Sequence, residues 1–190
     1  MIGKGHGLRE FGGVIEVFKA YCTRVGAGPF PTDLTGAIGR EIRQLANEVG
    51  MTTGRDECIG WFDGVAGRYS ARVNGFDSVI ITRLEILDNF DCINVCAAYK
   101  LDDDRINLFP IDAELLERSK QIYETPNNWS GTIAGVTDPD DLPAKARAYM
   151  EFLETLLGVP ASIISTGPLR DETIKYRLCS AMLKASTITS

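Results

Sequence analysis

The clearest periodic pattern in the chain lies between Asp141 and Pro160. Apolar residues recur there at intervals of three and four positions, which predicts a helix over Leu142–Leu157. Asp141 is the expected N-cap, Pro143 suits the first turn, and Gly158 followed by Pro160 is expected to end the helix. The expected buried stripe consists of Leu142, Ala146, Tyr149, Met150, Leu153, Leu156 and Leu157.

Two further helices follow from the same spacing. One is predicted over Gly39–Val49 with Gly50 as its stop, and the other is capped by Asp63 and runs to about Asn74. The residues expected to face inward are Ile42, Leu45, Ala46 and Val49 in the first helix, and Val65, Ala66, Tyr69 and Val73 in the second.

Short runs rich in Val, Ile, Phe, Tyr and Thr predict strands between these helices. The predicted strands are Val14–Arg24, Ser78–Thr82, Cys92–Leu101 with a hairpin partner at Arg105–Phe109, and Ala161–Ser165. Helices that alternate with short apolar strands indicate an α/β fold, with a mixed, largely parallel sheet flanked by helices. Ligands of such folds bind beyond the carboxyl ends of the strands.

Composition and charge narrow the class of protein. A chain of 190 residues with 44% hydrophobic and 24% charged residues fits one globular domain. We expect residues 1–12 to be a disordered leader, 13–178 the domain and 179–190 a tail. The net charge of −6 argues against nucleic-acid binding, and without a membrane-length apolar run or a secretory signal we expect a cytoplasmic protein with no membrane partner.

The five cysteines and one histidine include no CxxC pair, which argues against a disulfide framework or a zinc site. Cys92 and Cys96 are expected to fill the core.

A loop of two hydroxyls, a glycine and a guanidinium is the first candidate for chemistry. It comprises Met51, Thr52, Thr53, Gly54 and Arg55, and could hold a carboxylate while donating to a sugar hydroxyl. Taken alone, these five residues are better explained as a solvated glycine turn. The segment Arg24–Thr32, with its glycines and prolines, has an irregular backbone that could aim N–H groups at a ligand, or could be only a rigid turn.

Five blocks in this order and spacing resemble the adenylosuccinate synthetase family. They are KAYCTRVGAGPFPT (19–32), TTGRDECIGWFD (52–63), YETPNNW (123–129), DLPAKARAYMEFLETLLGVP (141–160) and ISTGPLRDETI (164–174). The resemblance implies the C-terminal portion of that fold, in a ligase of purine and AMP biosynthesis that joins aspartate to IMP with GTP and Mg²⁺.

The resemblance also implies a role for each matching position. Aspartate would be bound by Met51, Thr52, Thr53, Gly54 and Arg55, and IMP by Val25, Gly26 and Arg55. GTP would be bound by Glu57, Arg83, Leu84, Glu85, Ser165, Thr166 and Gly167. No catalytic residue or metal ligand of the family matches a position here, because those residues lie in the family's N-terminal half.

Three positions depart from the family pattern. Glu57 stands where the family has Arg, and an Arg about 4 Å from an anion gains on the order of 4 kcal/mol at an effective dielectric near 20, whereas Glu is repelled. Arg83 and Glu85 replace Lys and Asp in the family's base-recognition tetrapeptide. Glu85 reaches roughly 1.5 Å further than Asp, so an otherwise unchanged pocket would grip guanine badly.

Two hypotheses about function therefore stay open. In the first, the chain is the C-terminal part of the ligase, inactive alone and completed by an N-terminal segment, in a homodimer. In the second, it is a nucleotide-binding module derived from that family that has lost catalysis or changed its specificity.

Overall fold

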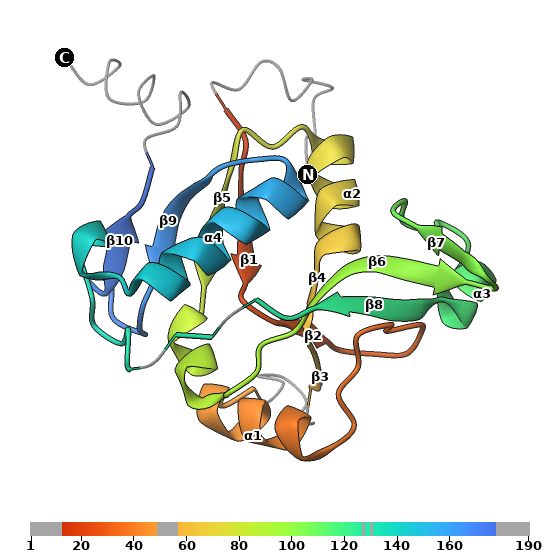
Figure 1. Ribbon diagram of the computed structural model, residues 1–190, viewed down its shortest axis with the longest axis horizontal. Helices are drawn as coiled ribbons and strands as arrows, with labels where there is room; N and C mark the ends of the chain where they lie inside the picture. Colours follow the sequence, from red (N-terminus) through yellow and green to blue (C-terminus); the bar gives the residue numbers. More distant parts are fainter. Residues whose placement is uncertain (1–12, 49–56, 127, 130, 178–190) are drawn as a thin grey trace.

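The computed structural model describes residues 13–48, 57–126, 128–129 and 131–177 (Figure 1). Within these residues the hydrophobic runs of the chain form helices and strands. The helices are α1 (Ala37–Ala46), α2 (Gly64–Asn74), α3 (Ala113–Arg118) and α4 (Ala144–Leu157), with the 3-10 turns η2 (Leu84–Asn89) and η3 (Pro139–Asp141). The strands are β1 (Ile15–Lys19), β2 (Cys22–Arg24), β3 (Cys58–Gly60), β4 (Phe62–Asp63), β5 (Ser78–Thr82), β6 (Val95–Leu101), β7 (Asp104–Ile106), β8 (Lys120–Glu124), β9 (Ala161–Ser165) and β10 (Thr173–Lys175).

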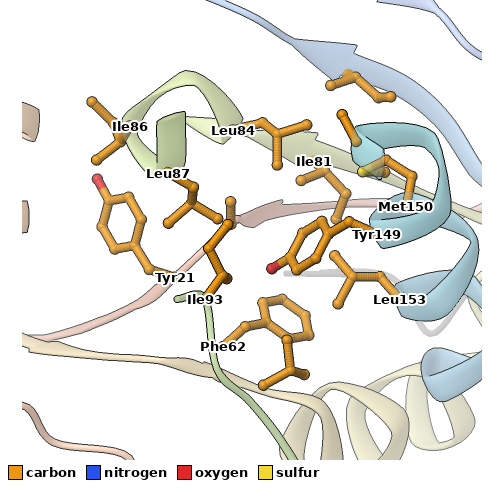
Figure 2. Close-up of a cluster of buried hydrophobic side chains, with 14 of the residues drawn as sticks. Tyr21, Phe62, Ile81, Leu84, Ile86, Leu87, Ile93, Tyr149, Met150 and Leu153 are labelled. Carbon is orange, nitrogen blue, oxygen red and sulfur yellow. The ribbon is translucent and has the colours of Figure 1, made fainter. Parts of the chain in front are cut away.

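The main sheet has the order β1-β5-β9-β10 within the described residues. Strands β1, β5 and β9 are parallel, and β10 is antiparallel to β9. The long helix α4 covers one face of this sheet, where the fully buried Ile81 points toward Tyr149 and Met150 (Figure 2). A mixed, largely parallel sheet flanked by helices is therefore confirmed.

The remaining described strands form two smaller sheets. Strand β6 pairs in parallel with β4 and antiparallel with β7 and β8, while β2 pairs antiparallel with β3. The predicted β6–β7 hairpin is confirmed, although β6 begins at Val95 rather than Cys92 and β7 is shorter than expected. Because Cys92 lies outside the strand it is exposed, so its expected burial was wrong, while Cys96 is buried as predicted.

The single strand predicted over Val14–Arg24 is two strands. The chain breaks at Ala20 and Tyr21, both fully buried, and β2 then leaves the main sheet to pair with β3. The hydroxyl group of Tyr21 is held by the carboxylate of Glu48, at the end of the segment that follows α1, which explains why the ring turns inward and the strand stops.

Helix bounds and faces also differ from expectation. Helix α4 begins after Pro143, so Asp141 caps nothing there and instead belongs to η3, whose own cap is Asp138. Gly158 ends α4 in the left-handed conformation, as predicted. The predicted α4 stripe is buried except for Leu156, which is half-buried.

Helix α1 ends at Asn47 in the left-handed conformation, before Val49 and Gly50, which lie outside the described residues. Ile42 and Ala46 are buried as predicted, but Leu45 is exposed.

Asp63 caps α2 through hydrogen bonds from the backbone N–H groups of Val65 and Ala66, as predicted. The expected inward positions Tyr69 and Val73 are exposed. Helix α2 instead turns Gly64 and Gly67 toward α4, where a Cβ on Gly64 would lie 2.1 Å from Leu156 Cδ2. Close helix packing, which a hydrophobicity pattern does not register, thus decides the buried face.

Among the described residues, no helix combines the length and the apolar character needed to cross a bilayer.

Candidate functional site at the carboxyl ends of the parallel strands

Two of the segments singled out from the sequence meet at one edge of the main sheet. Arg83–Glu85 follows β5, and Thr166–Gly167 follows β9. These strands are parallel neighbours in which Ile81 lies opposite Ile164, so the segments that follow them leave the sheet side by side. The turn η2, which contains Glu85, also contacts β9. Both segments therefore lie at the carboxyl ends of neighbouring parallel strands, where α/β proteins commonly bind ligands.

Arg83 and Glu85 have unusual environments. Arg83 adopts a left-handed backbone conformation with φ 63°, which residues other than glycine seldom take. Glu85 is half-buried, and its Oε2 atom is buried without a hydrogen-bond partner. Burial raises the pKa of the Glu85 carboxyl, while hydrogen bonding to its own backbone and the charge of Arg83 oppose that shift. An unpartnered carboxylate oxygen of this kind is ready to accept from a ligand N–H.

The β9 loop is held in a fixed shape by Glu172. Its backbone carbonyl accepts from Thr166 N at 2.9 Å, and its Oε2 accepts from Leu169 N at 2.8 Å. A Cβ at position 167 would lie 2.2 Å from that same Oε2, so a larger residue there would displace the Glu172 carboxylate from this position. Ser165 Oγ donates to Gly167 O at 2.9 Å within the turn. The sequence reasoning missed Glu172 because its role depends on the folded loop.

Asp88 fixes the segment that lies next to this loop. Its carboxylate accepts from Trp129 Nε1 at 2.6 Å, from Thr132 Oγ1 at 3.0 Å and from Ile133 N at 2.8 Å. That segment in turn contacts the β9 loop, because Thr166 Oγ1 donates to Val136 O at 2.7 Å. Trp129 is therefore a buried packing residue whose indole N–H has a hydrogen-bond partner.

The predicted aspartate loop, Met51 to Arg55, lies outside the described residues, and the nearest described residues on either side are Glu48 and Glu57. Glu48 precedes it, and its carboxylate accepts two hydrogen bonds from Lys19 Nζ, at 2.8 and 2.9 Å, and one from Tyr21 OH at 2.6 Å. Glu57 follows it and donates its backbone N–H to Glu48 O at 3.5 Å. Glu48 and Glu57 are therefore adjacent, and Glu48 lies beside the carboxyl end of β1.

The residues around Glu48 lower the pKa of its carboxyl. Burial alone would raise the pKa of its carboxyl, but hydrogen bonds from Lys19 and Tyr21, with the nearby positive charges of Lys19 and Arg83, outweigh burial and hold that pKa below its usual value. The positive charge of Arg83 favours a lower pKa for both the Glu48 carboxyl and the Tyr21 hydroxyl. Arg83, in the segment after β5, therefore interacts electrostatically with Glu48, which precedes the predicted aspartate loop. In Figure 1, α1, β3 and η2 gather at the same end of the main sheet, and α1 contacts η2.

Val25 and Gly26 begin the loop that follows β2. Since Arg24 pairs with Cys58 in the β2–β3 ladder, Val25 lies next to Glu57 across that ladder. Val25 is 68% exposed, and Gly26 has a positive φ of 99°. Arg24 stacks 5.3 Å above the Phe30 ring and donates to Gly28 O, which fixes the loop as the rigid turn expected from its glycines and prolines.

The segments that follow β5 and β9 bring a carboxylate close to a glycine turn. Glu85 could accept from two N–H groups on the edge of a purine, beside the glycine turn at 166–167. Among the residues that the structure describes, no three His, Cys, Asp or Glu side chains are grouped as a metal ion requires.

Comparison with known proteins identifies relatives over almost the whole chain. The family model described as adenylosuccinate synthetase matches residues 1–174. The chain is 48% identical over 173 residues to the adenylosuccinate synthetase of Synechococcus sp. (strain WH7803) and 45% identical over 172 residues to that of Desulfatibacillum aliphaticivorans. These alignments cover 91% and 90% of this chain, but only 40% of each relative.

A solved structure shares the fold. It is the fully ligated adenylosuccinate synthetase from Plasmodium falciparum, which is 30% identical in sequence and superposes with a TM-score of 0.86. The match covers 92% of this chain and 42% of that one. The chain thus spans about two-fifths of the length of the relatives that it matches.

Proposed function

The chain belongs to the adenylosuccinate synthetase family, and on this premise we propose that it is the C-terminal part of an adenylosuccinate synthetase-like ligase. The completed enzyme would convert IMP, aspartate and GTP into adenylosuccinate, GDP and phosphate. This chain would supply the aspartate loop and the guanine pocket. An N-terminal segment would supply the groups that grip phosphate, bind Mg²⁺ and transfer protons, in a cytoplasmic homodimer.

One observation carries the proposal: the segments at 83–85 and 165–167 lie side by side beyond adjacent parallel strands. In this reading Glu85 accepts from the N–H groups of guanine, and the backbone at Thr166 and Gly167 borders the base. The unpartnered Oε2 of Glu85 supports the assignment, because a buried carboxylate oxygen without a donor is costly unless a ligand supplies one.

The proposed aspartate and IMP contacts would lie near the carboxyl end of β1 and the loop that follows β2. Met51, Thr52, Thr53, Gly54 and Arg55 would bind the aspartate carboxylate, with Arg55 also reaching the ribose of IMP. Val25 and Gly26 would border the IMP. Their support is that Glu48 and Glu57, the described residues nearest the 51–55 segment, are adjacent to each other, with Glu48 beside β1 and Glu57 at the end of the β2–β3 ladder from which Val25 leaves.

A second candidate is a nucleotide-binding module of altered specificity or without catalysis. The residues Glu57, Arg83 and Glu85 favour it, because all three depart from the family pattern at positions proposed to face the nucleotide.

Isothermal titration calorimetry of the chain with GDP, ATP, IMP and aspartate tests nucleotide binding. We expect GDP to bind, and Glu85→Gln to weaken that binding by about tenfold or more, which corresponds to roughly 1.4 kcal/mol. Glu114→Gln is the matched control, because Glu114 is an exposed carboxylate on α3, in the part of the fold built around β6. Absence of binding by every ligand at millimolar concentration would refute both candidates.

A second measurement separates the two candidates. The chain is co-expressed with the N-terminal portion of the Synechococcus relative, and adenylosuccinate formation is followed by absorbance. The ligase proposal expects product only when both polypeptides are present. Nucleotide binding without product in an isolated complex of the two polypeptides would favour the module.

A further inference from the structure

The turn η2 carries two carboxylates on the same side. Glu85 and Asp88 are three positions apart, and side chains with that spacing in a 3-10 helix lie one above the other. Burial is the main cause of the raised pKa of the Glu85 carboxyl, and the negative charge of Asp88 adds to it. Their hydrogen bonding differs, because the buried Oε2 atom of Glu85 has no partner among the described residues, whereas Asp88 accepts three hydrogen bonds. One carboxylate is thus left for a ligand, and the fold uses the other.

Both oxygens of Asp88 bind residues that follow β8. Its Oδ1 accepts from Trp129 Nε1, whose ring is buried and packs edge-on against Tyr149. Its Oδ2 accepts from Thr132 Oγ1 and from Ile133 N. Trp129 therefore ties Asp88 to the core, while the second oxygen fixes the segment 131–136.

Segment 131–136 in turn holds the turn that follows β9. Gly135 N donates to Thr166 O at 3.2 Å, and Thr166 Oγ1 donates to Val136 O at 2.7 Å. Thr166 is completely buried, so these bonds are shielded from water. The contacts form a continuous path that starts at η2, which carries Glu85, and passes through Asp88 and segment 131–136 to the turn at 166–167.

We propose that Asp88 is a positioning residue for guanine, because it fixes the Glu85 carboxylate relative to the turn at 166–167. The inference rests on the proposed function, since it deepens the guanine site assigned there. Asp88 acts through these two segments and not on the base, because its oxygens already accept from Trp129, Thr132 and Ile133. Guanine offers a carboxylate two adjacent N–H donors, and a pair of hydrogen bonds to one group weakens steeply when that group is displaced.

A purely structural role for Asp88 has a different consequence. Loss of stability alone would leave the choice between bases unchanged, whereas a displaced Glu85 would alter it. Inosine 5′-diphosphate is the informative comparison with GDP, because it keeps the sugar, the phosphates and the N1–H group and lacks only the 2-amino group. The ratio of the two affinities therefore reports the position of the Glu85 carboxylate.

The first test is calorimetry of the chain with GDP and with inosine 5′-diphosphate, at a temperature at which circular dichroism shows every variant to be folded. Wild type should prefer GDP by about tenfold or more, since a hydrogen bond to a charged group contributes about that factor. Asp88→Asn keeps the shape of the side chain but has one acceptor oxygen instead of two, and should reduce the preference to about threefold or less. Asp91→Asn is the matched control, because Asp91 is an exposed carboxylate two positions beyond η2, and it should leave the ratio unchanged.

A milder variant covers the case in which Asp88→Asn does not fold. Thr132→Val removes one of the three donors to Asp88 at an exposed position and should lower the preference for GDP in the same direction, by about twofold.

The second test needs no nucleotide. Hydrogen exchange of the Gly135 amide, which donates to Thr166 O, should be at least about tenfold faster in Asp88→Asn than in wild type. The Val79 amide, which donates to Pro160 O beside the main sheet, is the internal control and should exchange at the wild-type rate.

The inference is overturned if Asp88→Asn keeps the wild-type ratio of affinities, if it weakens both nucleotides equally, or if Gly135 exchanges at the wild-type rate. A wild-type chain without a preference for GDP refutes the proposed guanine site, and the positioning role with it. The exchange data tell these failures apart, because they show whether Asp88 holds segment 131–136 whatever the chain binds.

Discussion

Replacing Glu48 by Gln tests how the base of the predicted aspartate loop is held. The substitution keeps the size of the side chain but removes its charge and one acceptor oxygen. In the wild-type chain that carboxylate accepts from Lys19 Nζ at 2.8 Å and from Tyr21 OH at 2.6 Å. The side chain of Glu48 is 10% exposed and that of Lys19 is 34% exposed, so the ion pair is partly shielded from solvent.

The expected cost follows from these contacts. A hydrogen bond to a charged group contributes about 1.5–3 kcal/mol, whereas a fully exposed ion pair contributes about 0–1 kcal/mol. The amide oxygen of the substituted side chain can still accept one hydrogen bond, from either Tyr21 or Lys19, and solvent at Lys19 screens part of the charge. We therefore expect Glu48→Gln to lower the free energy of unfolding at pH 7 by about 1–2 kcal/mol.

The effect of pH has a definite sign. Because the pKa of Glu48 is lower in the folded chain than in the unfolded chain, its contribution is fully present above the unfolded pKa. The contribution is lost as the pH falls through the lowered folded pKa. The difference between wild type and Glu48→Gln should therefore shrink in acid.

The assay is urea unfolding followed by tryptophan fluorescence, since Trp61 and Trp129 are both buried. Glu41→Gln on the exposed side of α1 is the control and should change the stability by less than about 0.5 kcal/mol. If Glu48→Gln matched this control at pH 7, or lost more stability relative to wild type as the pH fell, the reasoning would be refuted.

Three other substitutions have expected outcomes. Glu85→Asp shortens the side chain to the family length and should tighten GDP binding by about tenfold in calorimetry; weaker binding would favour altered specificity. Gly167→Ala places a Cβ against Glu172 Oε2 and should weaken GDP binding by about tenfold or more, with wild-type affinity contradicting a role for this loop. Asp63→Ala removes the α2 cap and the partner of the buried Tyr99 hydroxyl, and should lower the unfolding free energy by about 2–4 kcal/mol; a loss below about 1 kcal/mol in urea would contradict this.

The sequence predicted the elements whose pattern is local. Asp63 as a helix cap, Gly158 as a helix stop and the strands Ser78–Thr82 and Ala161–Ser165 depend on neighbouring residues, and the structure confirms all of them. The short α3 and β8 were missed. Helix α3 buries none of its residues, so it has no apolar stripe to detect, and β8 is half-exposed.

In the candidate site, too, some features were predicted from the sequence and others depend on contacts made only in the folded chain. The resemblance implies that residues 83–85 and 165–167 contact the same ligand, and in the structure the segments that follow β5 and β9 are adjacent. The roles of Glu48, Asp88 and Glu172 could not be read from the sequence, because each acts on residues brought near it by folding. Glu48 joins Lys19 from 29 positions away, and Asp88 joins Trp129 from 41 positions away.

Glu57 shows how a family scaffold can keep its shape while its charge changes. Its backbone N–H donates to Glu48 O, and its backbone carbonyl accepts from Arg43 Nε at 2.9 Å. Both contacts use main-chain atoms, so they can form with either Arg or Glu at this position. An Arg at this position, which the resemblance implies for the family, could therefore make the same two contacts, whereas its exchange for Glu would change the local charge by two units. The preserved fold and the altered electrostatics are thus independent, which is why similarity of fold identifies the family while the choice of nucleotide has to be measured.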